Sequence, residues 1–357
     1  MTTTENLTIN RLLNTLAERG ATDAHFIVGN NPYLRIDGQL VPLSEEEVIN
    51  PEFLDSLISF FVPEEKQKAL KENKELKFIF NWLDKARFRV HLYQQKGYFS
   101  LALKLIPQQI KSIEELGLPK VVSTFSQASK GLIIISGPFN SGRSSTLAGL
   151  IEAINKNRPA RILYLEEPIE RLFVNQKGII EQREVGIDVV SFTQGLRSIK
   201  DENVDVVAID RVDNVEAMEL LLELSESGRL VLAVMNYDSA ISCLEGIVSD
   251  FPEAKKQWAQ DVLADYLVGI IVQRLLPAVQ GGLALATEIL IASSSAKALI
   301  KDGRFANLES IIQTSRAEGM VSLDFALAEL VKTGRVSQEE ALKQANNPKN
   351  LSASLKK

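Results

Sequence analysis

The sequence predicts an α/β protein in which a mixed α+β domain precedes a domain built on a parallel sheet. Its 357 residues exceed one domain of roughly 150 residues, which favours two domains. After residue 130, four continuous apolar runs alternate with helical stretches, as expected of parallel strands buried on both faces. Before that point, short stretches with alternating apolar and polar residues predict strands with one exposed face.

The first domain is predicted to open with a helix that ends at Gly20, because apolar residues recur there at helical spacing. A strand begins near His25, and Asp37-Gly38 is a hairpin signal. The predicted order is helix, short strands, helical stretch and longer strands, over residues 7–20, 25–43, 51–73 and 76–106. The domain ends near Pro107, and we place the boundary so that the two domains are residues 1–112 and 113–357.

The second domain is predicted from its buried-strand runs. A helical bridge is expected over residues 112–129. The runs read GLIIIS, RILYLE, VDVVAID and RLVLAVM, with a helix over residues 143–157 after the first. Strands that alternate with helices indicate a parallel sheet of RecA type. From residue 241 onward the pattern is mostly helical and ends in a helical hairpin over residues 323–345 and a basic, polar tail.

Composition narrows the function classes. The net charge of -6 and a pI near 5.3 give no electrostatic footprint for a nucleic-acid backbone, so direct nucleic-acid binding is not expected. The single cysteine, Cys243, excludes an internal disulfide framework and fits a reducing, cytoplasmic location. No secretory signal is visible at the N-terminus. The apolar stretch at residues 267–272 is far shorter than the roughly 18 residues of a membrane helix, so no transmembrane segment is expected.

The loop after the first buried strand carries the main chemical motif. Residues 137–144 match the phosphate-binding pattern G-x-x-x-x-G-K-[ST] except that Arg143 replaces the lysine. In such a loop, backbone N–H groups and the helix N-terminus hold phosphates, and the hydroxyl after the basic residue can ligate Mg²⁺. The candidate nucleotide ligands are Gly137, Ser141, Gly142, Arg143, Ser144 and Ser145, with Ser144 as the metal ligand. A glycine turn with no ligand is the alternative.

Arginine is not a conservative replacement for this lysine. Lysine is a compact point charge that reaches the β- and γ-phosphates, whereas the guanidinium of Arg143 is longer, planar and forked. Phe139 and Asn140 are also expected to crowd positions where small residues would let the backbone close over phosphate. With both changes, the loop is expected to keep nucleotide binding but to align the phosphates poorly for hydrolysis.

Several blocks resemble the type IV pilus retraction ATPase family over nearly the whole chain. The stretch ATDAHFIVGNNPYLRIDG resembles that family's A-S-D-L-H and R-V-D-G segments, and ARFRVHLY resembles its A-R-F-R-V-N. The stretch RILYLEEPIE resembles its acidic box I-x-T-I-E-D-P-I-E, and KGIIEQREVG followed by FTQGLRSIKDENVDVV resembles its next block. The matches occur in the family's order, so the chain is identified as a divergent, PilT-like member.

The resemblance implies a fold, an assembly and partners. It implies a PAS-like N-terminal domain, a RecA-like P-loop ATPase domain with a helical C-terminal part, and ATP or ADP with Mg²⁺ as ligands. It also implies a homo- or hetero-hexameric ring that acts in the cytoplasm, at the inner-membrane face of a pilus machine. The expected partners are pilus motor ATPases and the inner-membrane platform protein.

The resemblance also assigns roles to individual residues. Glu166 stands where the family keeps the glutamate that activates water, which suits a general base. The alternative is a solvated acid at a strand end. Arg87 and Arg89 match arginines that reach the nucleotide across a subunit interface, and the alternative is that they line a wet strand face.

The Walker B block departs from the family. There the family has a glutamate after its apolar run, whereas VDVVAID is followed by Arg211. Two positive charges are therefore expected to face each other at the metal site. A cation roughly 5 Å from Mg²⁺ at an effective dielectric of about 20 is repelled by several kcal/mol. Asp210 could ligate the metal instead if the strand end turns, although adjacent strand residues face opposite sides.

Two further motifs are altered. Asn236 replaces the histidine of the family's T-L-H-T-T box, which removes a titratable contact near the γ-phosphate. The family's A-I-R-N-L-I-R-E motif corresponds to residues 295–302, where lysines replace both arginines and aspartate replaces the glutamate.

Three hypotheses follow. The first is a pseudo-ATPase paralogue that regulates or adapts pilus function in twitching motility or DNA uptake (natural transformation), with or without an active motor ATPase in the same ring. The second is a slow ATPase that uses Glu166, Asp210 and Arg143. The third is a scaffold that senses nucleotide without hydrolysing it. The loss of several positioned charges favours the first, because each contributes strongly to phosphoryl transfer.

Overall fold

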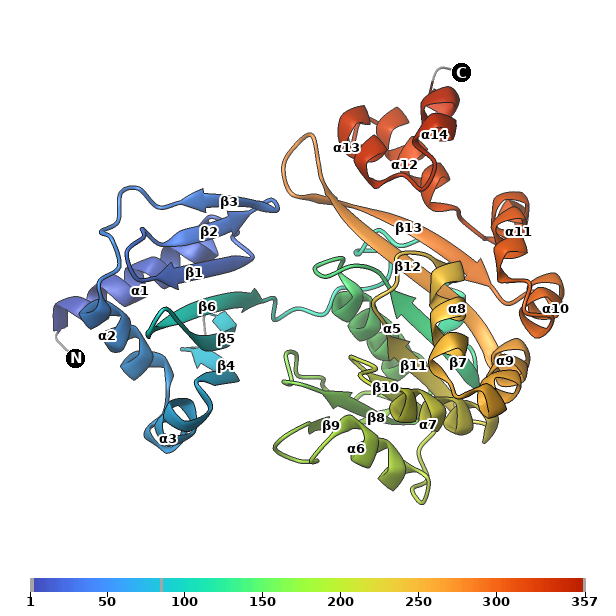
Figure 1. Cartoon of the computed structure of the whole chain (residues 1–357), viewed down its shortest axis with the longest axis horizontal. Helices are drawn as coiled ribbons and strands as arrows, with labels where there is room; N and C mark the ends of the chain where they lie inside the picture. Colours follow the sequence, from blue (N-terminus) through green and yellow to red (C-terminus); the bar gives the residue numbers. More distant parts are fainter. Residues whose placement is uncertain (1–2, 84–85, 356–357) are drawn as a thin grey trace. The chain divides into compact units, whose positions relative to one another are not determined.

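The computed structural model describes residues 3–83 and 86–355 and divides the chain into two compact units (Figure 1). The first unit comprises residues 1–109 and 170–172, and the second comprises residues 110–169 and 173–357. Residues 84–85, inside the predicted strand region 76–106, and residues 356–357 of the predicted basic tail lie outside the described residues. The two units contain two separate sheets. The predicted α/β fold class is confirmed.

The first unit is a six-stranded antiparallel sheet with helices on one face. The strand order is β3-β2-β1-β6-β5-β4. Along β5, buried residues such as Phe88 and Val90 alternate with half-exposed ones, and the buried ones pack in one cluster with α1 and α2. The elements are α1 (Thr3–Glu18), β1 (Asp23–Ile27), β2 (Tyr33–Ile36), β3 (Gln39–Pro42), α2 (Pro51–Phe61), α3 (Glu64–Asn73), β4 (Glu75–Trp82), β5 (Ala86–Gln95) and β6 (Tyr98–Ile106).

The second unit is built on a seven-stranded sheet in the order β13-β12-β7-β11-β10-β8-β9. All neighbouring pairs are parallel except β12 and β13. The strands are β7 (Gly131–Ser136), β8 (Arg161–Glu166), β9 (Ile179–Glu184), β10 (Val206–Ile209), β11 (Leu230–Val234), β12 (Leu267–Pro277) and β13 (Leu283–Ile291). Every residue of β7, β10 and β11 is buried, as their uninterrupted apolar sequences predicted.

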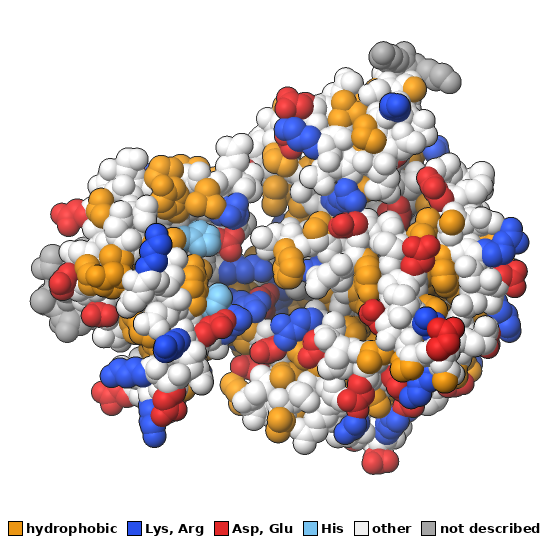
Figure 2. All heavy atoms as spheres, viewed as in Figure 1, with side chains coloured by type: hydrophobic (Ala, Val, Ile, Leu, Met, Phe, Trp, Pro, Cys, Tyr) orange, Lys and Arg blue, Asp and Glu red, His pale blue; other side chains and the backbone are white. Residues whose placement is uncertain are grey.

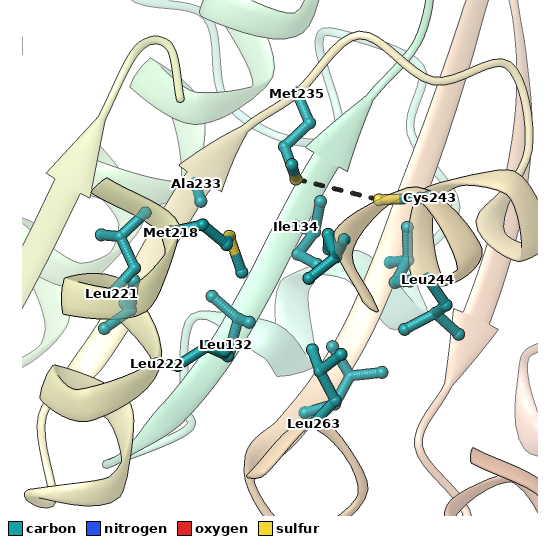
Figure 3. Packing of buried hydrophobic residues seen from close by; sticks show 14 of the residues in the cluster. Leu132, Ile134, Met218, Leu221, Leu222, Ala233, Met235, Cys243, Leu244 and Leu263 are labelled. Carbon is teal, nitrogen blue, oxygen red and sulfur yellow. Dashed lines mark hydrogen bonds between the residues drawn. The ribbon is translucent and has the colours of Figure 1, made fainter. Parts of the chain in front are cut away.

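Helices cover both faces of this sheet. They are α4 (Val121–Phe125), α5 (Arg143–Asn157), α6 (Phe192–Ile199), α7 (Val215–Glu226), α8 (Ala240–Asp250), α9 (Glu253–Tyr266), α10 (Ser294–Lys301), α11 (Leu308–Thr314), α12 (Leu323–Lys332), α13 (Gln338–Gln344) and α14 (Pro348–Leu355), with short 3₁₀ turns at Phe305–Asn307 and Arg316–Glu318. On one face, Leu132 and Ile134 of β7 pack against Leu222 of α7, Cys243 of α8 and Leu263 of α9 (Figure 3). The opposite side chains of β7 pack against α4 and α5.

One expectation about secondary structure is incomplete and one is wrong. The region after residue 241 is mostly helical in its described residues, as predicted, but it also contains β12 and β13, which form a long antiparallel hairpin that joins the sheet beside β7. A short apolar run such as residues 267–272 cannot be distinguished from a buried helix by periodicity alone. The predicted helical bridge over residues 112–129 contains only α4. Gly117, with φ of 74°, and Pro119 interrupt the helical pattern there.

Candidate functional site

The predicted phosphate loop lies at the carboxyl edge of the parallel strands. β7 ends at Ser136, residues 137–142 form the loop, and α5 begins at Arg143. The neighbouring strands β11, β10 and β8 run parallel to β7, so Asn236, Asp210 and Glu166 follow or end their strands at the same edge. In open α/β sheets this edge is where ligands bind.

The backbone of the loop requires its glycines. Gly137 has φ of 139°, and a Cβ placed there would lie 2.3 Å from the Gln273 carbonyl oxygen of β12. Gly142 caps α5 in the left-handed region with φ of 88°, where glycine carries little steric cost. Asn140 adopts φ of 63°, one of the few residue types that tolerate this region. The Phe139 side chain is 81% exposed and therefore points to solvent.

Hydroxyl groups gather at the start of α5. The Ser141 side chain is only 2% exposed, and its Oγ has no hydrogen-bond partner among the described residues. Ser144 and Ser145 lie in the first turn of α5, and the Ser145 N–H donates to the Gly142 carbonyl oxygen at 3.0 Å. A buried hydroxyl without a partner, next to the free N–H groups of a helix start, is suited to phosphate oxygens. These residues therefore fit the nucleotide that the motif implies.

Arg143 contacts the end of β11. Its Nη1 donates to the Met235 carbonyl oxygen at 2.5 Å and to Asn236 Oδ1. The guanidinium carbon also lies 5.6 Å from the centre of the Phe139 ring, within the range of a cation–π contact. Burial lowers the pKa of the Arg143 guanidinium. The basic side chain of the loop is thus directed to protein acceptors.

Arg211 has different partners from Arg143. It follows Asp210 at the end of β10, forms an ion pair with Glu167, and lies 5.2 Å from the centre of the Phe192 ring. Carboxylate and ring partners supplied by neighbouring segments hold the Arg211 cation at the edge of the sheet.

The two candidate catalytic carboxylates make contacts within the protein. Glu166 is 4% exposed, and its Oε2 accepts a hydrogen bond from Gln182 Nε2 at 2.9 Å. Gln182 is on β9, which flanks β8 on the side away from β7. Asp210 is half-buried, and its Oδ2 accepts from the Glu167 N–H at 3.2 Å. At about 4.8 Å per strand, the backbone of β8 lies roughly 14 Å from β7.

Arg87 and Arg89 belong to the first unit. Both lie on β5 and are half-buried on the face opposite Phe88 and Val90. Their position fits strand residues on a polar sheet face, and the role that the resemblance assigns to them stays a prediction.

Sequence reasoning missed two polar residues of the site. In the sequence, Gln182 is identifiable only as a member of the block after the acidic box. Gln273 was read as the end of an apolar stretch, yet it is 1% exposed, its Oε1 has no partner among the described residues, and its carbonyl oxygen lies against Gly137. The available signal was a glutamine that directly follows a buried apolar run.

Known proteins resemble this chain over nearly its whole length. The family model for "Type II/IV secretion system protein" matches residues 3–350. The chain belongs to this family. The type IV pilus retraction ATPase PilT of Pseudomonas aeruginosa is 32% identical over 348 residues, which cover 96% of this chain and 99% of PilT. The pilus ATPase PilU of the same organism is 30% identical, covering 97% of this chain and 91% of PilU.

Solved structures agree with the family assignment. A crystal structure of the pilus retraction motor PilT with bound ADP superposes with a TM-score of 0.84 at 33% identity, covering 96% of this chain and 98% of PilT. The ATPase DotB of Legionella pneumophila superposes with a TM-score of 0.82 at 17% identity, covering 94% of each chain, which shows a shared fold. The predicted PilT-like identity is confirmed, and the relatives are pilus motor ATPases.

Three further properties complete the description of this PilT-like chain. Within residues 3–83 and 86–355, no helix is both long and apolar enough to cross a membrane. In the same ranges, His, Cys, Asp and Glu side chains form no group of three or more that could hold a metal ion. On the face of the second unit that Figure 2 shows, acidic and basic side chains are interspersed.

Proposed function

We propose that this chain is a PilT-like pilus motor protein that binds ATP or ADP but hydrolyses ATP poorly, and that it adapts type IV pilus function. The phosphates would be held by Gly137, Ser141, Gly142, Ser144 and Ser145. Ser144 and Asp210 are the candidate Mg²⁺ ligands.

The proposed setting is a hexameric ring in the cytoplasm, formed by this chain alone or with an active motor ATPase, beside an inner-membrane platform protein. In such a ring, Arg87 and Arg89 of one copy would approach the nucleotide of its neighbour. Twitching motility and DNA uptake are the processes such a ring would serve. The proposed domains remain residues 1–112 and 113–357.

The observation that carries the proposal is the placement of the two carboxylates. Glu166 is hydrogen-bonded to Gln182 on the far side of β8 from the phosphate loop. Asp210 accepts the Glu167 N–H. A general base must come within about 3 Å of the attacking water, directly or through one further water. These contacts each hold one carboxylate oxygen, so only the second oxygen could serve hydrolysis unless the hydrogen bond opens.

The cations at the edge support the same conclusion. Arg211 stands where the related ATPases keep a glutamate, and its ion pair with Glu167 holds a positive charge beside Asp210. Removing one group that stabilises developing charge typically costs about 10²–10³ in rate. Changes at Arg143, Arg211 and Asn236 together therefore favour a very slow or inactive enzyme.

A slow ATPase is the second candidate, and the position of Asp210 favours it. Asp210 directly follows β10, and β10 is separated from β7 only by β11. Its backbone therefore lies roughly 10 Å from β7. A half-buried carboxylate at this distance could reach a metal ion bound to the terminal phosphates if its contact with Glu167 opened.

The test measures binding and turnover on one sample of the full chain. A fluorescent ATP analogue is titrated with Mg²⁺, and phosphate release is followed for the wild type and for Glu166→Gln. The control is Glu226→Gln, which changes an exposed carboxylate at the end of α7. Saturable binding with background phosphate release in all three proteins supports the proposal. Mg²⁺-dependent turnover that Glu166→Gln alone abolishes would establish the slow ATPase instead.

A further inference from the structure

The contacts of Arg143 bear on which nucleotide the loop accepts. In a phosphate loop, the backbone N–H groups hold the α- and β-phosphates, and the basic side chain reaches the β- and γ-phosphates. In this chain the basic side chain ends on the Met235 carbonyl oxygen and on Asn236 Oδ1. Those two oxygens therefore border the region where a third phosphate would be expected.

The segment that carries these acceptors is held rigidly. The Met235 N–H donates to the Ile135 carbonyl oxygen at 2.9 Å. The Tyr237 N–H donates to Ser136 Oγ at 2.8 Å, and that hydroxyl donates back to the Tyr237 carbonyl oxygen at 2.9 Å. Asn236 is thus fixed from both sides against the last two residues of β7. Acceptors that are already in place require no reordering to hold the guanidinium.

Packing of the Tyr237 ring adds to this rigidity. A Cβ placed on Gly246 of α8 would lie 2.3 Å from the ring, so the ring rests directly on the backbone of α8. Burial raises the pKa of the Tyr237 phenol, in accord with a ring that is partly withdrawn from water. The segment from Met235 to Tyr237 is therefore anchored to both β7 and α8.

We propose that the Arg143–Asn236 contact makes this a nucleoside-diphosphate site, which takes ADP in preference to ATP. The proposal rests on the nucleotide binding proposed above. A β-phosphate can occupy the loop while Arg143 keeps its partners. A γ-phosphate must either displace the Met235 and Asn236 oxygens from the guanidinium or lie against these two carbonyl dipoles, which repel phosphate oxygens.

Asn236 supplies an acceptor that does not depend on protonation state. Its Oδ1 accepts from Arg143, whereas a protonated imidazole offers only donors and would repel the guanidinium. Arg143 in turn can reach across because its planar fork is longer than a lysine ammonium. The two residues act as a pair, and Asn236 is a positioning residue that acts through Arg143.

The test compares the affinities of the full chain for ADP and for the β,γ-imido analogue of ATP, both with Mg²⁺, by calorimetric titration. Loss of one charge-assisted hydrogen bond corresponds to about a tenfold change in affinity. Wild-type protein is expected to bind ADP at least about tenfold more tightly than the analogue, on the same grounds. Arg143→Lys and Asn236→Ala should each reduce this ratio to near one, mainly by strengthening analogue binding.

Matched controls separate this idea from the binding function itself. Arg197→Lys on α6 and Asn157→Ala at the end of α5 make the same chemical changes at exposed sites, and both should keep the wild-type ratio. Equal or tighter binding of the analogue by the wild type would overturn the diphosphate preference while leaving nucleotide binding intact. A preference for ADP that persists in both loop variants would refute the role of the Arg143–Asn236 pair. Absence of binding for both nucleotides would overturn the nucleotide-binding function and this inference together.

Discussion

Replacing Gly137 with alanine should destabilise the second unit far more than the same change at Gly282. Both glycines have positive φ, 139° and 75°. A left-handed conformation costs an alanine about 1–2 kcal/mol, and this should be the whole effect at Gly282, where no atom lies within 4 Å of the new Cβ. At Gly137 the strained backbone costs about 1–3 kcal/mol. The contact with the Gln273 carbonyl oxygen adds about 1–3 kcal/mol, because a backbone atom must move.

The expected loss at Gly137 is therefore about 2–6 kcal/mol, the sum of these two contributions. Hydrogen exchange of the β7 amides, followed by mass spectrometry over a urea series, reports the free energy of opening of the second unit alone. Gly137→Ala should lower that free energy by clearly more than Gly282→Ala does. Equal losses for the two variants would mean that the close approach of β12 to the loop is not part of the folded state.

Three other changes have defined outcomes. Leu222→Ala should cost about 2–5 kcal/mol in urea unfolding, since the side chain is fully buried; a loss below 1 kcal/mol would contradict that packing. Cys243 should resist a disulfide reagent until the protein unfolds, because burial raises the pKa of its thiol, and rapid native labelling would contradict this. The Arg183 guanidinium lowers the pKa of the Glu202 carboxyl from its usual 4.5, so the ionised form stabilises the fold above pH 4.5 and this contribution is lost as the pH falls further. Glu202→Gln should therefore cost about 1 kcal/mol at pH 7 and less at pH 3, and a cost independent of pH would exclude the ion pairs with Arg161 and Arg183.

Local sequence was sufficient for the centre of the second unit. The run Gly131–Ser136 is apolar at nearly every position and rich in β-branched isoleucine, which favours a strand buried on both faces. The glycines at positions 137 and 142 predict a strand–loop–helix junction from the sequence alone. The first unit was also readable, because its strands keep one polar face and alternate accordingly.

The hairpin β12–β13 was not predictable by the same means. β12 is apolar on both faces beside β7, and its sequence resembles that of a short buried helix. Its pairing with β7 joins Ile133 to Gly269, residues far apart in the chain. A strand identity that depends on such a distant partner leaves little local signal.

For the site, residue types were predictable but side-chain directions were not. Arg143 and Asn236 were both singled out, yet they are 93 positions apart, and nothing in the local sequence indicates their contact. Arg211 is also identifiable from its motif position, but its partner Glu167 lies 44 positions away on a neighbouring strand end. Electrostatic arguments from sequence count charges correctly, but the fold decides which charges meet.

Side-by-side ATP turnover by the wild type and by the triple variant Arg143→Lys, Arg211→Glu, Asn236→His tests the central claim most directly. The variant restores the lysine, glutamate and histidine of the related ATPases on an unchanged fold. Background phosphate release by the wild type and Mg²⁺-dependent release by the variant, about 10²-fold or more above it, is the predicted result. Equal, Mg²⁺-dependent turnover by both proteins would contradict the account, because these three residues would then not limit hydrolysis.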